Sequence, residues 1–105
     1  MIISFDFLNN PDLYPTIAAT CAGLGIKAHF TGLQNLKFKE SDRVAAMTME
    51  LSKIGVTNVF DSHNDHRIAM SLAPLAMKIG TVEINNAEVV SKSYPNFWQD
   101  FGLLT

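Results

Sequence analysis

The sequence predicts an α/β fold, because segments with the two-residue period of β-strands alternate along the chain with segments of helical period. Three predicted helices begin alike, with charged residues before an apolar run: PDLYPTIAA at 11–19, SDRVAAM at 41–47 and DHRIAM at 65–70. If these helices pack with parallel axes on a mixed sheet, their charged N-terminal ends meet. Residues 1–105 then form one domain with a site at that end.

The first half of the chain contains two predicted strands and two predicted helices. Residues 2–8 and 26–31 alternate apolar and polar side chains, as half-buried strands do. The helix between them starts with a proline at its first position and ends at Gly23 or Gly25. A second, shorter alternation at 36–39 leads into the next helix, whose apolar face consists of Val44, Met47, Leu51 and Ile54.

The second half of the chain repeats this order of elements. Residues 56–60 form a short β-prone run, and a polar turn leads into a helix in which Pro74 predicts a kink. Gly80 ends that helix, and residues 81–86 have the pattern of a strand. A short terminal helix begins at Pro95, and the aromatic residues on its face are predicted to pack in the core: Tyr94, Phe97, Trp98 and Phe101.

Composition narrows the class of protein. A hydrophobic content of 48% and a charged content of 17% suit one small globular domain. The net charge of −2, with dispersed lysines, argues against a nucleic-acid partner or an acidic membrane surface. Cys21 is the only cysteine, which excludes an internal disulfide and suits a reducing compartment. The sequence begins without a basic signal region and lacks a membrane-spanning apolar run, so we expect a cytoplasmic protein.

Two charged blocks, KESDR at 39–43 and NDHR at 64–67, contain the only arginines of the chain. A cation in a first helical turn opposes the helix dipole by ~0.3–1 kcal/mol, whereas backbone N–H groups and a guanidinium together bind a phosphate or carboxylate well. The alternative is that Asp42 and Asp65 neutralise the neighbouring arginines and leave two ordinary solvated helix starts. Because the pattern occurs twice, it favours a site for a small, multiply charged anion.

The same helix starts supply groups for proton transfer. Their carboxylates are Asp12, Glu40, Asp42 and Asp65, and the available cations are Lys39, Arg43, Arg67 and Lys92. Each acid is either a favourable first-turn charge or a carboxylate that nearby cations keep ionised as a general base. His66 has no second histidine at ligand spacing, so no metal site is predicted.

The motifs KESDRVAAM, NDHRIAM and KSYPNFW, preceded by PDLYPTIAA, resemble the C-terminal part of the 5-enolpyruvylshikimate-3-phosphate synthase family over nearly the whole chain. Enolpyruvyl transferases acting on UDP-N-acetylglucosamine share that fold, but the KESDR and NDHRxAM blocks resemble the shikimate-pathway family more closely. The resemblance implies part of a domain built from βαβαββ repeats. It also implies enolpyruvyl transfer from phosphoenolpyruvate to the 5-hydroxyl of shikimate 3-phosphate, without a metal or an organic cofactor.

The resemblance assigns roles to individual residues. Asp12 resembles the base that handles the 5-hydroxyl proton, and Glu40 resembles the acid/base group near the phosphoenolpyruvate methylene. Asn35 and Lys39 match positions that contact shikimate 3-phosphate. The cations that hold phosphoenolpyruvate are matched by Arg43, Arg67 and Lys92.

The chain also departs from the family. It resembles only the later part of the C-terminal domain, so the first-domain residues that complete both substrate sites are absent. The segment 56–63 is shorter than its counterpart, which usually carries an extra strand pair. We therefore expect a fragment that needs the missing N-terminal domain as its partner and does not turn over alone. The alternative is a non-catalytic module for anion binding or protein interaction.

Overall fold

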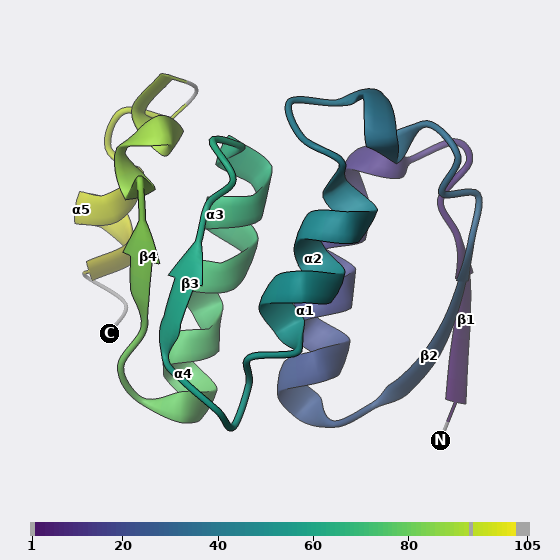
Figure 1. The fold of residues 1–105 in the computed structure, drawn as a ribbon, viewed down its shortest axis with the longest axis horizontal. Coiled ribbons are helices and arrows are strands. Elements are labelled where there is room, and N and C mark those ends of the chain that lie inside the picture. Colours follow the sequence, from purple (N-terminus) through teal and green to yellow (C-terminus); the bar gives the residue numbers. More distant parts are fainter. Residues whose placement is uncertain (1, 93, 103–105) are drawn as a thin grey trace.

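The computed structural model describes residues 2–92 and 94–102 and confirms the α/β class (Figure 1). In chain order, the elements are β1 (Ile2–Asp6), α1 (Tyr14–Leu24), β2 (Lys27–Thr31), α2 (Arg43–Leu51), β3 (Val59–Asp61), α3 (His66–Leu72), α4 (Ala76–Ile79), β4 (Glu83–Asn85) and α5 (Phe97–Gly102). Short 3₁₀ segments lie at Pro11–Leu13, Leu36–Phe38, Ala73–Leu75 and Ala87–Lys92. None of the described helices has the length and apolar character needed to cross a membrane.

The strands form two separate parallel pairs, and the expectation of a mixed sheet is wrong in this detail. β1 pairs with β2, with Ile2 opposite Lys27, and β3 pairs with β4, with Val59 opposite Glu83. Parallel neighbours need a long crossover connection; α1 joins the first pair, and α3 with α4 joins the second. Among the described residues, no strand of the first pair is hydrogen-bonded to a strand of the second.

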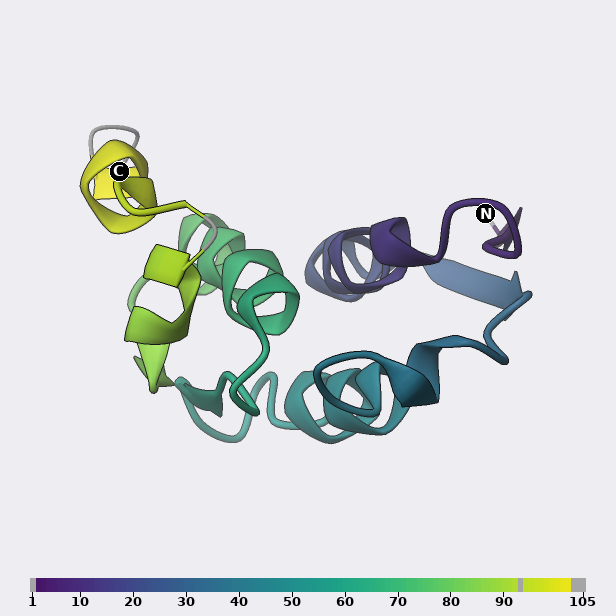
Figure 2. The same ribbon diagram turned by 90° about the horizontal axis from the view of Figure 1, so that it is seen from above.

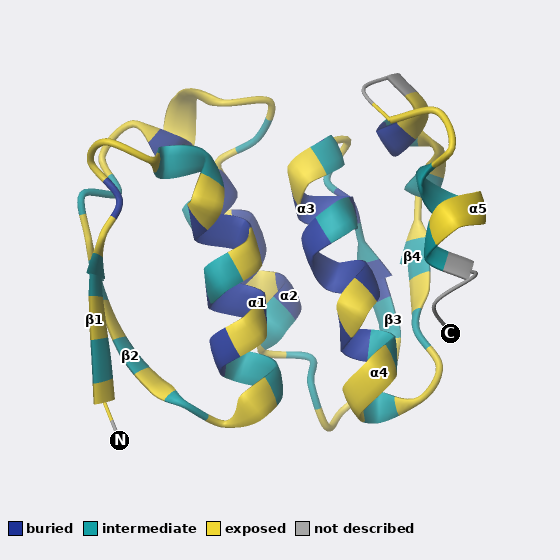
Figure 3. Ribbon diagram, turned by 180° about the vertical axis from the view of Figure 1, so that it is seen from behind, coloured by how far each residue is buried: buried dark blue, intermediate teal, exposed yellow. Residues whose placement is uncertain are grey.

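Helices α1, α2 and α3 pack against one another between the two sheets (Figures 1 and 2). Each of these helices carries buried residues (Figure 3), and all three contribute to the core. Both strand–helix–strand units contribute to one core, which consists of Phe7, Tyr14, Ala18, Ala19, Leu36, Ala46, Met47, Phe60, Ile68, Leu72 and Leu75. This shared core fixes the three helices relative to one another and brings their N-terminal ends to the same end of the molecule.

Glycine and proline residues shape the ends of the elements as their chemistry requires. Gly25 has a φ of 68° and ends α1 in the left-handed conformation. Pro74 lies in the 3₁₀ segment that separates α3 from α4, which confirms the predicted kink. At Gly32, where φ is 71°, a Cβ atom would collide with the Asp6 carboxylate and the Leu8 backbone, so only glycine fits there.

The alternation at 36–39 is a 3₁₀ turn and not a strand. Leu36 is fully buried, whereas Phe38 is exposed and has the Lys37 Nζ 5.2 Å from the centre of its ring. A pattern with two apolar residues is too short to distinguish a strand from a turn. The turn places Leu36 in the core and brings the KESDR block beside the start of α1, where Lys39 approaches Asp12.

Candidate active site

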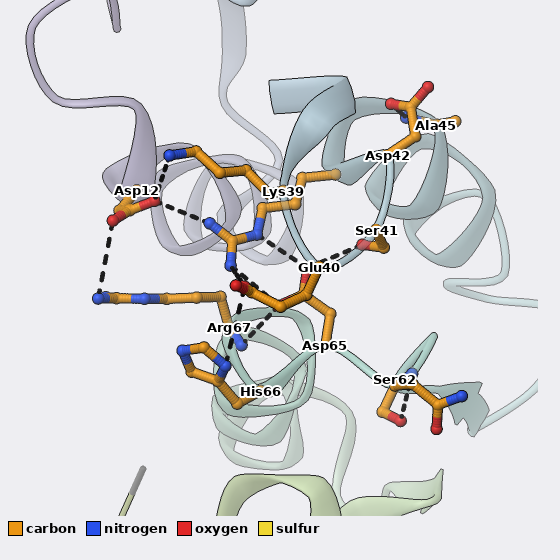
Figure 4. Close-up of polar contacts among 12 residues, drawn as sticks. Asp12, Lys39, Glu40, Ser41, Asp42, Ala45, Ser62, Asp65, His66 and Arg67 are labelled. Atoms are coloured by element: carbon orange, nitrogen blue, oxygen red, sulfur yellow. Dashed lines mark hydrogen bonds and ion pairs between the residues drawn. The ribbon is translucent and has the colours of Figure 1, made fainter. Parts of the chain in front are cut away.

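The three charged helix starts meet, as predicted, and Asp12, Glu40 and Asp65 converge there (Figure 4). The guanidinium of Arg43 joins the three carboxylates, although its side chain is only 2% exposed. Nη1 donates to Asp12 Oδ1 at 2.8 Å, Nη2 donates to Glu40 Oε2, and Nε donates to Asp65 Oδ2 at 2.8 Å. Burial disfavours its charge, but the carboxylates of Asp65, Glu40 and Asp12 outweigh burial and hold the pKa of Arg43 above its ordinary value.

Asp65 is the fully buried partner of Arg43. It caps α3 by accepting from the backbone N–H of Arg67 at 3.0 Å, and it also accepts from Ser41 Oγ at 2.8 Å and from Arg43 Nη2 at 3.1 Å. Burial would raise the pKa of this carboxyl, but the bonds from Arg43 and Ser41 outweigh it and hold the pKa below its ordinary value. Asp65 is therefore an ionised group that links the starts of α2 and α3.

Arg67 and Lys39 are held much more loosely. The Arg67 side chain is 44% exposed, and its Nη2 lies 3.9 Å from Asp12 Oδ2. The Lys39 side chain is 34% exposed, and its Nζ lies 3.9 Å from Asp12 Oδ1. Exposed ion pairs at this distance contribute little and are easily exchanged. These two cations can therefore turn towards a ligand at little cost.

The two predicted acid/base residues share the cluster with the cations. The side chains of Asp12 and Glu40 are 47% and 52% exposed. Glu40 Oε2 also lies 3.9 Å from His66 Nδ1. With Asp65, the cluster contains three carboxylates, which are balanced by Lys39, Arg43 and Arg67. Such an arrangement can bind an anion through its cations and exchange protons through its exposed acids.

Asn35 and Lys92 are the two predicted site residues that the described contacts do not bring into the cluster. Asn35 is exposed at the start of the 3₁₀ turn Leu36–Phe38, and within the described residues its side chain makes no hydrogen bond to the cluster. Lys92 is the last residue of the 3₁₀ segment Ala87–Lys92, and its side chain lies outside the described part of the structure. Their roles stay predictions.

The alternative of two ordinary solvated helix starts is wrong at the start of α2, where Arg43 is buried and pairs with the buried Asp65. Asp42 caps α2 by accepting from the Ala45 backbone N–H at 3.1 Å, and Arg43 turns away from it to Asp65. The sequence placed Asp65 among the carboxylates of the helix starts but gave it no specific role, and it gave Ser41 none. A cap-forming residue before an apolar run was visible in both cases, but the pairing across 22 residues between Arg43 and Asp65 was not.

The donor atoms of Glu40, Asp65 and His66 lie within 4.8 Å of one another, a spacing that a metal ion could bridge. However, both carboxylates already accept from Arg43, whose positive charge opposes a second cation at the same place. The residues therefore do not fit a metal centre well, and the absence of a metal stays a prediction.

A second buried carboxylate, Glu50, supports the turn that leads into the site. It accepts from Lys53 Nζ at 2.7 Å and from the Asp61 backbone N–H at 2.9 Å, and it lies 2.7 Å from His63 Nε2. Burial would raise the pKa of Glu50, but the bonds from Lys53, His63 and Asp61 hold it below its ordinary value. This network ties α2 to the turn before Asp65.

Comparisons of the sequence with known proteins all point to one family. The sequence model of the family described as EPSP synthase (3-phosphoshikimate 1-carboxyvinyltransferase) matches residues 2–60 and 57–101. The two matches meet within 56–63, the segment expected to be shorter than in the family.

Individual relatives carry the name 3-phosphoshikimate 1-carboxyvinyltransferase. One from Bacteroides fragilis is 39% identical over 116 residues, covering 90% of this chain and 28% of the relative. One from Syntrophobacter fumaroxidans is 37% identical over 118 residues, covering 94% of this chain and 28% of the relative. One from Clostridium novyi is 39% identical over 122 residues, covering 94% and 27%. The chain thus spans little more than a quarter of their length, and each alignment is longer than its 105 residues.

Proposed function

Since the chain belongs to the EPSP synthase (3-phosphoshikimate 1-carboxyvinyltransferase) family, we propose that it forms part of the site of an enzyme that transfers enolpyruvyl from phosphoenolpyruvate to shikimate 3-phosphate. The observation that carries this proposal is the placement of Asp12 and Glu40 in one cluster with Arg43, Arg67 and Lys39. Two anionic substrates must be held together despite their repulsion, and protons must be both removed and delivered, which requires cations and acids at one place.

The reaction divides between the two acids. Asp12 takes the proton of the 5-hydroxyl as its oxygen forms a bond to C2 of phosphoenolpyruvate, and Glu40 donates a proton to the methylene carbon. In the second step the carboxylate of Glu40 takes a proton back from this carbon, the C–O bond to phosphate breaks, and the enolpyruvyl product and inorganic phosphate result. Asn35 and Lys39 would contact shikimate 3-phosphate, and phosphoenolpyruvate would be held by Arg43, Arg67 and Lys92.

The hydrogen bonds of Arg43 suggest how binding prepares this chemistry. Its Nη1 and Nη2 atoms donate to Asp12 and Glu40, whose side chains are about half exposed. A substrate carboxylate that takes their place on Arg43 releases both acids for proton transfer. Substrate binding and activation of the base are then one event.

The chain alone is expected to be inactive. It spans 28% of its Bacteroides fragilis relative, and the family's cations from the other domain would be missing. Each lost charge-assisted contact costs ~1.5–3 kcal/mol, so several losses weaken substrate binding by orders of magnitude. Closure of the second domain would also be needed to exclude water.

Phosphate release from phosphoenolpyruvate and shikimate 3-phosphate tests this function. The 105-residue chain should give none above background. The same chain mixed with the separately expressed N-terminal part of the Bacteroides fragilis relative should restore release, and Asp12→Asn in the mixture should abolish it. Release by the chain alone at a full enzyme's rate would contradict its inactivity. A mixture that binds neither substrate would contradict the function.

The same experiment also tests two alternative functions. A simple anion-binding module would be weakened by acids at its cations, and Asp12 and Glu40 lie directly on Arg43. If the acceptor were UDP-N-acetylglucosamine, the mixture would release phosphate with that acceptor in place of shikimate 3-phosphate. We expect no phosphate release with UDP-N-acetylglucosamine.

A further inference from the structure

The guanidinium of Arg43 has two edges with different partners. Its side-on edge, Nε and Nη2, donates to both oxygens of Asp65, which is fully buried. Its end-on edge, Nη1 and Nη2, donates to Asp12 and Glu40, which are about half exposed. A ligand from solvent can replace the second pair of acids but cannot reach the first.

Asp65 has no hydrogen-bonding capacity left for any other task. Besides Arg43, it accepts from Ser41 Oγ at 2.8 Å and from the Arg67 backbone N–H at 3.0 Å. Ser41 precedes α2 by two residues, and its hydroxyl fixes the carboxylate from the side of the KESDR block. The Asp65 carboxylate therefore joins the two charged blocks through hydrogen bonds, and these bonds fix the plane of the Arg43 guanidinium.

We propose that Asp65 and Ser41 are positioning residues, which hold the side-on edge of Arg43 so that its end-on edge faces the carboxylate of a substrate anion. This inference rests on the proposed function for the identity of the anion, a small carboxylate such as phosphoenolpyruvate. A guanidinium fixed on one edge binds a planar carboxylate on the other without losing further side-chain freedom. Asp65 acts through Arg43 and does not touch the substrate.

Asp42 provides a matched control, because it is the equivalent cap of the neighbouring helix. It is exposed and accepts from the Ala45 backbone N–H, and no described ion pair joins it to Arg43. Asp42→Asn and Asp65→Asn remove the same charge from adjacent helix starts, and asparagine is an equally good cap at both. Only the second substitution disturbs the bonds to Arg43.

The two substitutions separate positioning from simple electrostatics. Removing a carboxylate near a cationic site should tighten anion binding if only long-range charge matters. Positioning predicts the opposite for Asp65→Asn. We expect phosphoenolpyruvate, titrated into the 105-residue chain and followed by NMR shifts, to bind about tenfold more weakly or worse to Asp65→Asn. Ser41→Ala should weaken it by about threefold, and Asp42→Asn should not weaken it. Binding to Asp65→Asn as tight as to Asp42→Asn would overturn the proposal.

A second readout, which includes a variant outside the buried carboxylate, keeps the test independent of affinity. The Nε–H of Arg43 is bonded to Asp65, so its NMR signal should exchange slowly with water in the wild-type chain and in Asp42→Asn. It should exchange faster in Ser41→Ala, which changes no charge, and fastest in Asp65→Ser, which keeps a capping residue. If the wild-type chain alone binds phosphoenolpyruvate too weakly to titrate, this signal alone decides the inference, and the mixture with the N-terminal part decides the proposed function. An unchanged signal in both variants would refute the inference.

Discussion

The arginines at the starts of α2 and α3 lie in one cluster but have opposite surroundings. The Arg43 side chain is 2% exposed and donates to three carboxylates, whereas the Arg67 side chain is 44% exposed and forms an ion pair at 3.9 Å with Asp12. Both follow an aspartate cap in the sequence, Asp42 and Asp65. The same local pattern thus produces a fixed cation and a movable one.

The capping residue Asp65, and not a property of the arginines themselves, makes Arg43 the fixed cation and Arg67 the movable one. Asp65 is buried and accepts from Arg43, while Asp42 is exposed and accepts from the Ala45 backbone N–H. A buried carboxylate requires a charged partner, so Arg43 cannot leave it. Arg67 is not held by a buried carboxylate, so its guanidinium is free to bind a ligand.

Removal of Arg43 should have the largest effect. Arg43→Met leaves Asp65 buried without its cation, which should lower the free energy of unfolding by ~3–5 kcal/mol. Urea denaturation measures this directly. The matched control is Arg67→Met, for which we expect a loss below ~1 kcal/mol because the side chain is exposed. Equal losses in the two variants would show that the contrast between the arginines is false.

Arg67 should instead matter for anion binding. Arg67→Gln removes a charge-assisted contact to the ligand, so phosphoenolpyruvate should bind at least about tenfold more weakly. The urea midpoint of the chain should hardly change, since only a 3.9 Å ion pair is lost. Titration calorimetry and denaturation on the same sample separate the two effects. A variant with lower stability and unchanged affinity would reverse the roles we assign.

Acid should lower the stability of the fold, because it protonates two buried carboxylates. The folded pKa values of Asp65 and Glu50 lie below their ordinary values of 3.8 and 4.5, so these groups bind fewer protons when folded. Their stabilisation is complete above the ordinary values and is lost as the pH falls through the lower folded values. Urea midpoints measured at decreasing pH should therefore fall in this range, and fall less steeply in Asp65→Asn and in Glu50→Gln. Wild-type midpoints that do not change with acid would contradict the assignment.

Loss of the ordinary cap should have the smallest effect. Asp42→Ala removes one bond to the Ala45 backbone N–H, which should cost about 1 kcal/mol of stability. Phosphoenolpyruvate affinity should not fall. Weaker binding in this variant would show that the start of α2 contributes to the site through its cap as well.

Local rules accounted for most of the fold. Helical periodicity, glycine stops and caps predicted the helices, and Pro74 predicted the break between α3 and α4. The pairing of the strands was harder to predict from the sequence, because the strands of a parallel pair such as β1 and β2 are separated in the chain by a whole helix. The 3₁₀ turn at 36–38 could not be predicted from local sequence, because the burial of Leu36 and the exposure of Phe38 depend on the rest of the core.

For the site, the sequence indicated that Asp12, Glu40, Arg43 and Arg67 belong together, and the structure brings them together. Neither periodicity nor spacing could show which acid pairs with which arginine. That choice depends on burial, which made Asp65 a partner of Arg43 and left Asp42 in solvent. The resemblance assigns Lys92 to the same site, and its placement stays a prediction.

The most direct test of the contrast is an NMR spectrum of the arginine side-chain Nε–H groups, with and without phosphoenolpyruvate. The chain has only two arginines, so only two such signals are expected. We predict that the Arg43 signal is protected from exchange with water in both conditions, because Asp65 holds it. The Arg67 signal should be lost to exchange in the free chain and should become protected when phosphoenolpyruvate binds. An Arg43 signal that exchanges as fast as that of Arg67 in the free chain would contradict the account.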